Sequence, residues 1–155
     1  MRIFNQHLPD EIATERFGRR LGQLLAGRGM VFLEGELGAG KTTLSRGILR
    51  GMGHKGAVKS PTFTLVEPYD LGDKMVYHFD LYRLQDPQEL EYLGIDDYLE
   101  GNQLCLVEWP DKGAGHLPPH DLRIELLVLD QGRQCTMTAF SGLGDAICVA
   151  LLESA

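Results

Sequence analysis

The segment GELGAGKTT, residues 35–43, constrains this chain more than any other part of its sequence. It fits the phosphate-binding pattern G-x-x-x-x-G-K-[ST], which begins at Gly35 and ends at Lys41 and Thr42. An apolar run precedes it at residues 30–34, and a helical pattern follows it to about Arg50. A strand, a glycine-rich loop and a helix form the context in which backbone N–H groups surround phosphates. The segment therefore predicts a nucleotide-binding loop, but it leaves the purpose of the nucleotide open.

Each residue type in this loop suits contact with phosphate. The two inner glycines carry no side chain that would keep phosphate oxygens away from the backbone. The following helix directs the positive end of its dipole toward the same place. Lys41 is expected to bridge the β- and γ-phosphates, and the Thr42 hydroxyl is expected to bind Mg²⁺. The predicted nucleotide contacts of the loop are Gly38, Ala39, Gly40, Lys41, Thr42 and Thr43.

The rest of the pattern predicts helices and strands in alternation. A helix follows Pro9-Asp10-Glu11 and closes near Gly27, and a last helix covers about residues 142–153. A further helix start is predicted at Asp86. The predicted strands are residues 63–67 and 75–80, which form a hairpin, residues 104–108, and a second hairpin that turns at residues 130–133.

These elements predict the architecture of the chain. The nearly all-apolar run at residues 104–108 is typical of a parallel sheet that is covered on both faces. We therefore expect an α/β, three-layer fold like that of P-loop NTPases, with parallel strands near the nucleotide and antiparallel hairpins added. The length of 155 residues predicts one domain, residues 1–155.

Two acidic residues stand at the ends of predicted strands, where a P-loop enzyme holds its metal. Glu108 ends the apolar run LCLVE, and Asp80 ends the more mixed run MVYHFD. Mg²⁺ prefers oxygen ligands and keeps several waters. Glu108 is therefore the predicted metal ligand together with Thr42, and Asp80 is predicted to orient the attacking water or to share the metal's ligand shell. Either carboxylate would instead face solvent or cap a turn if its strand simply ended at the surface.

Two further candidates lie near these acids in the sequence. Thr62, in the segment SPTFT, follows a glycine-containing loop, and a hydroxyl there can sense the γ-phosphate through Mg²⁺ as a switch segment does. A proline turn that enters a strand is the plainer interpretation of the same residues. Trp109 directly follows Glu108. A lone tryptophan more often serves packing, but beside a metal ligand it is also a candidate contact for a partner.

Composition excludes several other classes of protein. The net charge of −7 provides no broad attraction to nucleic acid, so we expect no direct, strong RNA or DNA binding. Three cysteines without C-x-x-C spacing argue against a disulfide framework or a zinc site. The first residues contain no apolar run, and no segment reaches the roughly 20 apolar residues of a membrane span. The sequence therefore predicts a cytoplasmic protein that does not cross a membrane.

Four segments in order make the chain recognisable: GELGAGKTT, SPTFTLVEPY, YHFDLYRL and LVEWPD. The chain resembles the TsaE family, also called YjeE, over nearly its whole length. The resemblance implies an ATPase with little activity alone that uses ATP and Mg²⁺. It also implies that this ATPase joins TsaB and TsaD and supports repeated threonylcarbamoyl modification (t6A) of the tRNA adenosine next to the anticodon. Contact with tRNA would then be indirect, through the complex.

The resemblance also implies roles for single residues. Lys41, Asp80 and Thr62 match the positions that serve hydrolysis, and Glu108 matches the Mg²⁺ ligand. Trp109 matches the tryptophan that follows this ligand. Two positions are associated with contacts to adenosine, and they are Thr14 on the first helix and Arg133 in the late hairpin.

Three other classes of nucleotide-binding protein share the loop. A small-molecule kinase would need an acceptor pocket and usually a lid that bears arginines, and no arginine-rich lid is evident in the sequence. A GTP switch would carry an N-K-x-D stretch to read guanine, and Asp111-Lys112 lacks the asparagine. A scaffold that binds nucleotide without hydrolysis would show no turnover even with partners present.

Overall fold

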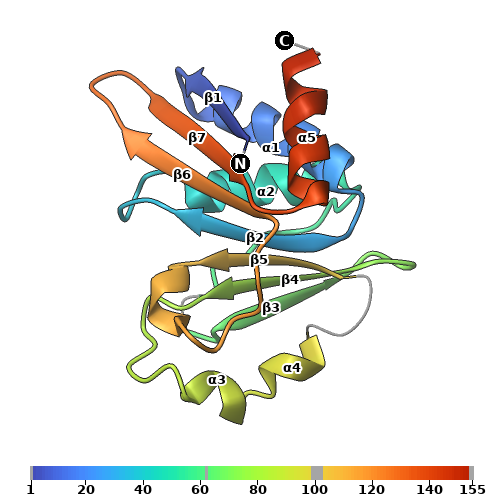
Figure 1. Cartoon of the computed structure of the whole chain (residues 1–155), viewed down its shortest axis with the longest axis vertical. Helices are drawn as coiled ribbons and strands as arrows, with labels where there is room; N and C mark the ends of the chain where they lie inside the picture. Colours follow the sequence, from blue (N-terminus) through green and yellow to red (C-terminus); the bar gives the residue numbers. More distant parts are fainter. Residues whose placement is uncertain (1, 62, 99–102, 154–155) are drawn as a thin grey trace.

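A seven-stranded mixed sheet forms the centre of the molecule (Figure 1). The computed structural model describes residues 2–61, 63–98 and 103–153. The strands are β1 (Ile3–Leu8), β2 (Gly29–Glu34), β3 (Val66–Asp70), β4 (Met75–Asp80), β5 (Leu104–Glu108), β6 (Leu122–Val128) and β7 (Arg133–Ala139). The helices are α1 (Glu11–Leu25), α2 (Lys41–Gly51), α3 (Glu89–Tyr92), α4 (Ile95–Tyr98), the 3₁₀ turn η1 (Pro110–Gly113) and α5 (Gly142–Glu153).

The sheet has the strand order β1-β7-β6-β2-β5-β4-β3. Strand β2 lies at its centre and runs parallel to both of its neighbours, β5 and β6. Strand β4 is parallel to β5, whereas β3 and the pair β7 and β1 join antiparallel at the two sides. The predicted α/β sheet, with parallel strands at the phosphate loop and antiparallel hairpins beside them, is confirmed.

Apolar side chains cover both faces of the central strands. In β2, Val31 and Leu33 belong to one buried cluster, with residues of α1, α2 and α5, while Phe32 belongs to a second cluster on the other face. That second cluster contains Leu90 of α3 and Ile95 of α4. Burial on both faces explains why β2 and β5 read as continuous apolar runs instead of alternating ones.

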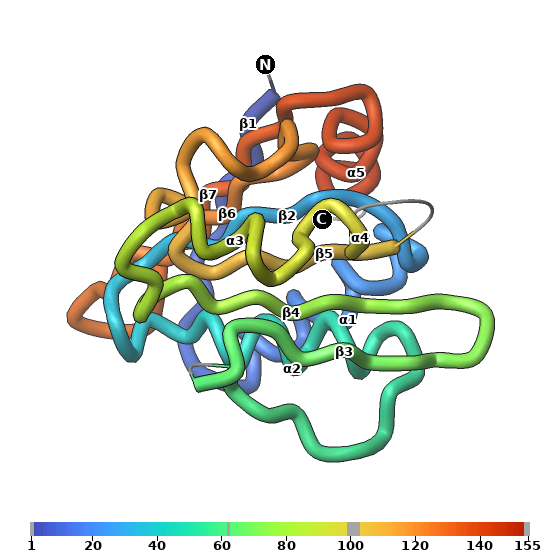
Figure 2. The backbone as a smooth tube through the Cα atoms, turned by 90° about the horizontal axis from the view of Figure 1, so that it is seen from below, coloured from blue at the N-terminus to red at the C-terminus, as the bar shows by residue number. Residues whose placement is uncertain are grey.

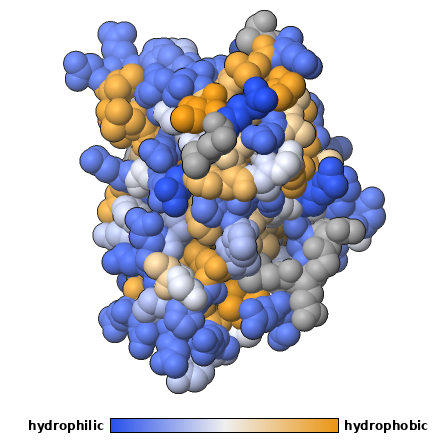
Figure 3. All heavy atoms as spheres, in the orientation of Figure 1, coloured by the Kyte–Doolittle hydropathy of each residue, from blue (hydrophilic) through white to orange (hydrophobic). Residues whose placement is uncertain are grey.

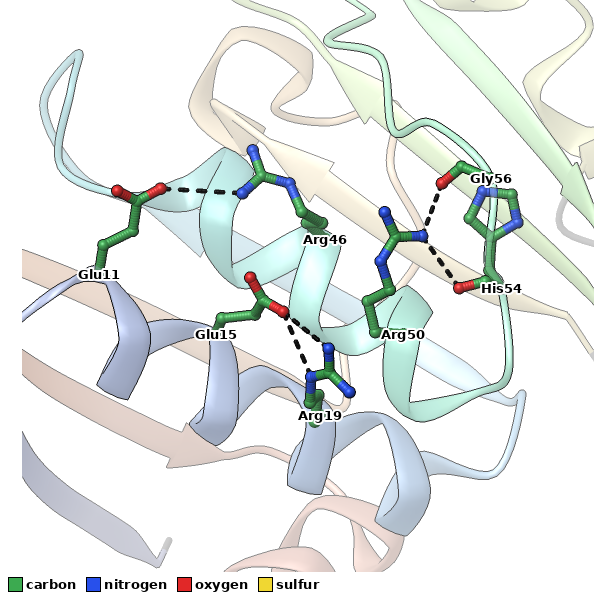
Figure 4. Close-up of polar contacts among 7 residues, drawn as sticks. All are labelled: Glu11, Glu15, Arg19, Arg46, Arg50, His54 and Gly56. Carbon is green, nitrogen blue, oxygen red and sulfur yellow. Dashed lines mark hydrogen bonds and ion pairs between the residues drawn. The ribbon is translucent and has the colours of Figure 1, made fainter.

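Helices α1 and α2 pack with their backbones in contact. A methyl group added to Gly22 of α1 would clash with the Ile48 carbonyl oxygen of α2, and one added to Gly47 of α2 would clash with the Glu15 carbonyl oxygen of α1. Only glycine permits this approach. A Glu11–Arg46 ion pair of 3.8 Å adds a polar link between the helices (Figure 4). Because α2 carries the phosphate loop at its beginning, α1 holds that end of the site in place.

The first hairpin differs from its prediction. The predicted hairpin is present, but its first strand is displaced: β3 begins at Val66 instead of residue 63 and includes Pro68, which was expected in the loop. The chain turns just before it, where the Leu65 N–H donates to the Pro61 carbonyl oxygen at 2.8 Å and Leu65 has a left-handed φ of 67°. Strand β3 lies at the edge of the sheet, and an edge strand can accommodate a residue without an N–H.

Strand β1 has no counterpart in the prediction. It pairs with β7 and buries only Phe4 and Leu8, while its other residues are exposed. The helix predicted near Asp86 is present but short, since α3 begins at Glu89 after a turn in which the Asp86 carboxylate accepts from the Gln88 N–H at 3.0 Å. The last two strands and α5 occur where the sequence predicts them.

The chain between α2 and β3 loops out beside the edge of the sheet (Figure 2). Figure 3 shows polar and apolar residues interspersed over one face, with an apolar group over the turn between β6 and β7. Leu127, Val128 and Leu129 at that turn are exposed. Among the described residues, no helix has the length and apolar character needed to span a bilayer.

Candidate functional site

The phosphate loop connects the carboxyl end of β2 to the amino end of α2. Gly38 and Gly40 have φ values of 81° and 109°, which residues with a Cβ rarely adopt. Gly40 is the N-cap of α2 and has no side chain to cover the first N–H groups of the helix. These groups and the helix dipole therefore remain available to an anion. The predicted loop has the local geometry that phosphate binding requires.

Lys41 is folded back into the site. Its side chain is buried, and its ammonium donates to the Gly35 carbonyl oxygen at 2.5 Å and lies 3.8 Å from the centre of the Trp109 ring. Burial lowers the pKa of Lys41 below its usual range, while the nearby charges of Glu108 and Asp80 oppose that shift. The lysine is thus held by a carbonyl and a ring, and two negatively charged carboxylates lie near it.

The two predicted strand-end acids are neighbours. Asp80 and Glu108 occupy paired positions at the carboxyl ends of the parallel strands β4 and β5, and both are buried. Asp80 accepts from the Tyr82 N–H at 3.0 Å, so it caps the turn after β4 as one interpretation expected. Glu108 contacts His78, with 2.6 Å between its Oε2 and the histidine Nε2. Neither acid faces open solvent.

These groups line one cavity of about 260 Å³. Its lining residues are Leu37, Gly38, Gly40, Lys41, Thr42, Thr43, Ser60, Asp80, Glu108 and Trp109. The structure therefore brings together the predicted phosphate loop, both acids and the tryptophan. Thr62 lies outside the described residues, but Ser60 of the same segment reaches the cavity.

The donor set in this cavity fits Mg²⁺. Thr42 offers a hydroxyl, and Asp80 and Glu108 offer carboxylates, all hard oxygen ligands. Within residues 2–61, 63–98 and 103–153, no group of three or more His, Cys, Asp and Glu side chains is arranged to hold a metal ion. An ion bound here would therefore need phosphate oxygens and water to complete its ligands, as Mg²⁺ does with nucleotides.

A second cavity of about 300 Å³ adjoins the loop on its other side. It is lined by Pro9, Asp10, Glu11, Thr14, Gly38, Ala39, Gly40, Thr43, Gly132 and Arg133. Thr14 is buried, and its hydroxyl donates to the Asp10 carbonyl oxygen at 3.2 Å. The two cavities share Gly38, Gly40 and Thr43, so they flank the same loop. Both residues associated with adenosine, Thr14 and Arg133, lie in this second cavity.

Arg133 contacts the phosphate loop directly. Its guanidinium donates from Nε to the Ala39 carbonyl oxygen at 2.8 Å and from a terminal nitrogen to the Gly38 carbonyl oxygen at 3.2 Å. These bonds join the start of β7 to a loop that precedes it by 94 residues. No local pattern in the sequence indicates this pair of bonds, which we call the Arg133 brace.

A third cavity, of about 430 Å³, adjoins Gly35 and Trp109 but is lined by Glu34, Glu36, Asp111 and Glu125. Burial raises the pKa of Glu34, the neighbouring Asp111 and Glu125 raise it further, and Arg123 opposes them. Such a concentration of carboxylates repels phosphate. The two cavities that flank the loop therefore suit a phosphate group better than this acidic one does.

His78 is a residue of this region that sequence analysis missed. It is fully buried and contacts Glu108, 30 positions further along the chain. One signal was present, because side chains alternate along MVYHFD and place His78 on the same face as Asp80. That pattern gives a shared face but no partner on the neighbouring strand.

The chain that leads to Ser60 is anchored at its beginning. Arg50, in the last turn of α2, donates from one nitrogen to the carbonyl oxygens of His54 at 3.0 Å and Gly56 at 2.6 Å (Figure 4). The Lys59 N–H then donates to the Tyr69 hydroxyl at 3.1 Å. Ser60 therefore follows a segment that is fixed to α2 and β3.

Comparison with known proteins gives consistent similarities. The sequence model of the family described as "Threonylcarbamoyl adenosine biosynthesis protein TsaE" matches residues 8–135. A tRNA threonylcarbamoyladenosine biosynthesis protein TsaE from Haemophilus influenzae is 48% identical over 155 residues, which cover 97% of this chain and 98% of that protein. The protein of the same name from Bacillus subtilis is 42% identical over 120 residues, covering 77% of this chain and 75% of that protein.

A solved structure shares the fold. The crystal structure of Bacillus subtilis YdiB superposes with a TM-score of 0.84 and is 29% identical in sequence. The superposition covers 99% of this chain and 96% of that one. The similarity extends beyond the phosphate loop to the whole mixed sheet.

Proposed function

This chain belongs to the TsaE family of threonylcarbamoyl adenosine biosynthesis proteins, and we propose that it binds ATP with Mg²⁺ and hydrolyses it slowly. One observation carries the proposal. Lys41, Asp80 and Glu108 converge from α2, β4 and β5 on the cavity beside the phosphate loop. A free-standing glycine turn would not require a buried lysine and two buried carboxylates at its side.

The chain's own residues divide the work of binding. N–H groups at the start of α2 and the Lys41 ammonium neutralise the phosphates. Thr42 and Glu108 would hold Mg²⁺, which would spread the charge that develops on the transferring phosphoryl group. Asp80, which lines the same cavity, orders the attacking water, with Thr62 as a second candidate for that role. Thr14 and Arg133 border the cavity assigned to adenosine.

The proposed binding and hydrolysis of ATP would act on partner proteins. We propose that TsaB and TsaD dock near the cavity, and that the nucleotide state determines whether they engage. Trp109 supports this idea because it is half-buried, lines the cavity and contacts Lys41. Contact with tRNA is then indirect, in keeping with the net charge of −7.

The segment before Ser60 suits a role in coupling. Its start is anchored by Arg50, and Ser60 itself is exposed at the rim of the cavity. Closure of residues 54–64 over ATP would link the γ-phosphate to the outer surface. Hydrogen exchange tests this step, because protection of residues 54–64 should rise with ATP. Protection that is independent of nucleotide would contradict it.

The decisive experiment measures phosphate release and multiple-turnover tRNA modification together, with TsaB and TsaD present. Lys41→Ala should abolish phosphate release, and Asp80→Ala should lower it while leaving ATP bound. Lys112→Ala is the matched control, because Lys112 is exposed and does not line the cavity. Normal turnover in Lys41→Ala would refute the assignment of the loop.

The same assay separates the alternatives. Repeated modification without phosphate release would favour a nucleotide switch that does not hydrolyse ATP, and transfer of phosphate to a small molecule would favour a kinase. For the metal, Glu108→Ala should weaken nucleotide binding in Mg²⁺ more than binding of ADP without Mg²⁺. An equal loss in both conditions would move the metal role to Asp80.

A further inference from the structure

His78 is a fully buried histidine next to the proposed metal ligand. It lies on β4, two residues before Asp80, and its Nε2 is 2.6 Å from Oε2 of Glu108 on β5. Its other ring nitrogen, Nδ1, is buried and has no hydrogen-bond partner among the residues that the structure describes. The contact with Glu108 is therefore the polar interaction that fixes this ring.

We propose that His78 is a positioning residue for the metal site. Its Nε2–H holds one oxygen of the Glu108 carboxylate, and this leaves Oε1 to face the Mg²⁺ that is bound with nucleotide. The inference rests on the proposed function, since it assigns a task within that site. Ligands of metals commonly depend on such outer hydrogen bonds for their orientation.

The position of the proton follows from the short contact. If Nε2 carried no proton, its lone pair would face a carboxylate oxygen at 2.6 Å, which is repulsive when Glu108 is ionised. A proton on Nε2 instead forms a short charge-assisted hydrogen bond. It also leaves Nδ1 of His78 without a hydrogen, so this ring has no buried N–H that lacks an acceptor. Nε2–H is therefore the tautomer that suits both ends of the ring.

Lys41 gives Glu108 a reason to need a fixed partner. The lysine charge attracts the Glu108 carboxylate, as its effect on the pKa of Lys41 indicates. In the proposed cycle Lys41 must turn to the phosphates. A glutamate side chain has three rotatable bonds, so without His78 the carboxylate could follow the ammonium instead of staying at the metal position. His78 on the rigid strand β4 prevents that movement.

The proton is tested first in the unmodified protein without metal or nucleotide. Long-range ¹H–¹⁵N spectra of labelled protein report the protonation of each ring nitrogen, and His78→Gln identifies the signal of His78 among the five histidines. We expect a proton on Nε2. A ring protonated on Nδ1 alone would overturn the inference. The spectra are recorded on the unmodified protein, and if His78→Gln fails to fold, single substitutions of the other four histidines leave the remaining signal assigned to His78.

The positioning role of His78 is tested with two variants that both carry a side-chain amide and differ in its reach. The amide nitrogen of His78→Gln falls near the place of Nε2, whereas that of His78→Asn falls near the place of Nδ1 and is too short to reach Glu108. Mn²⁺ binding to the ADP complex, followed by electron paramagnetic resonance, should weaken about 10- to 100-fold in the Asn variant. The Gln variant should stay within about threefold of the unmodified protein, and ADP affinity without metal should be similar in all three.

Equal losses of Mn²⁺ affinity in the Gln and Asn variants, or none in either, would refute a positioning role. Thermal unfolding of each variant shows whether a loss comes from a damaged fold. The experiment also separates the two proposals. If the unmodified protein binds no nucleotide and no Mn²⁺, the proposed function is wrong. If it binds both and the Mn²⁺ affinity of His78→Asn is unchanged, only the role of His78 is refuted.

Discussion

The ammonium nitrogen of Lys41 lies 3.8 Å from the centre of the Trp109 ring. A cation over an indole face is attracted by its π-electrons, and burial strengthens that attraction. Trp109 has a left-handed φ of 57°, which is rare for a bulky residue and costs energy. The contact fixes Lys41 at the ring, and in the proposed ATP complex the ammonium would move from the ring toward the phosphates.

This contact predicts an optical signal. Trp109 is the only tryptophan in the chain, so intrinsic fluorescence reports on its surroundings alone. Saturation with ATP should change the emission, because the positive charge leaves the ring. Lys41→Met keeps much of the side chain's volume but removes the charge, and its emission should respond to ATP far less. A full response in that variant would show that the signal does not come from the lysine.

The pKa of Lys41 predicts how affinity depends on pH. Burial lowers this pKa in the free protein, and phosphates beside the ammonium raise it in the complex. The complex therefore holds a proton that the free protein loses earlier as pH rises. Between the two pKa values, in the alkaline range, ADP affinity should fall about tenfold per pH unit. Calorimetric titration without Mg²⁺ measures this slope, and Lys41→Met should show a flatter profile.

The contact between α1 and α2 predicts a large effect of one methyl group. Gly47→Ala should lower the free energy of unfolding by about 1–3 kcal/mol, because the added carbon meets the Glu15 carbonyl oxygen. Gly142→Ala is the control, since a methyl group there meets open space at the start of α5. Urea denaturation compares the two. Equal stabilities would mean that the helices can separate without cost.

The Arg133 brace predicts a loss that separates two roles. Arg133→Lys keeps the charge but cannot make both bonds to the carbonyl oxygens of Ala39 and Gly38. We expect ATP affinity to fall about tenfold, which corresponds to roughly 1.4 kcal/mol. Amide exchange in residues 38–40 should also become faster. Exposed Arg28→Lys is the control. Weaker affinity with unchanged exchange would instead indicate that Arg133 contacts the nucleotide itself.

Local patterns were sufficient to predict the centre of this fold. The apolar run of β2, the glycines of the loop and the helical spacing of α2 are contiguous, so their period and turn residues determine them. Strand β1 was missed because only Phe4 and Leu8 face the core, which breaks the alternation. Strand β3 was misplaced because Pro68 signals a turn in sequence, while an edge strand tolerates it.

The site was predictable in its parts but not in its connections. The ends of the predicted strands indicate Asp80 and Glu108 as candidate site residues, and the loop motif indicates Lys41. Their convergence depends on the strand order, which pairs β4 with β5 and not with β2. The contacts of His78 and Arg133 cross 30 and 94 residues of chain, so no local period could indicate them.

The bonds from Arg133 to the phosphate loop also affect the order in which the protein becomes functional. Residues 38 and 39 leave a ribosome long before residue 133, because chains are synthesised from the amino end. The loop therefore exists for much of synthesis without the arginine that holds its carbonyl groups. A nascent chain that ends before β7 carries every residue of the motif but lacks its brace. The full nucleotide affinity that we propose therefore requires synthesis to have passed residue 133.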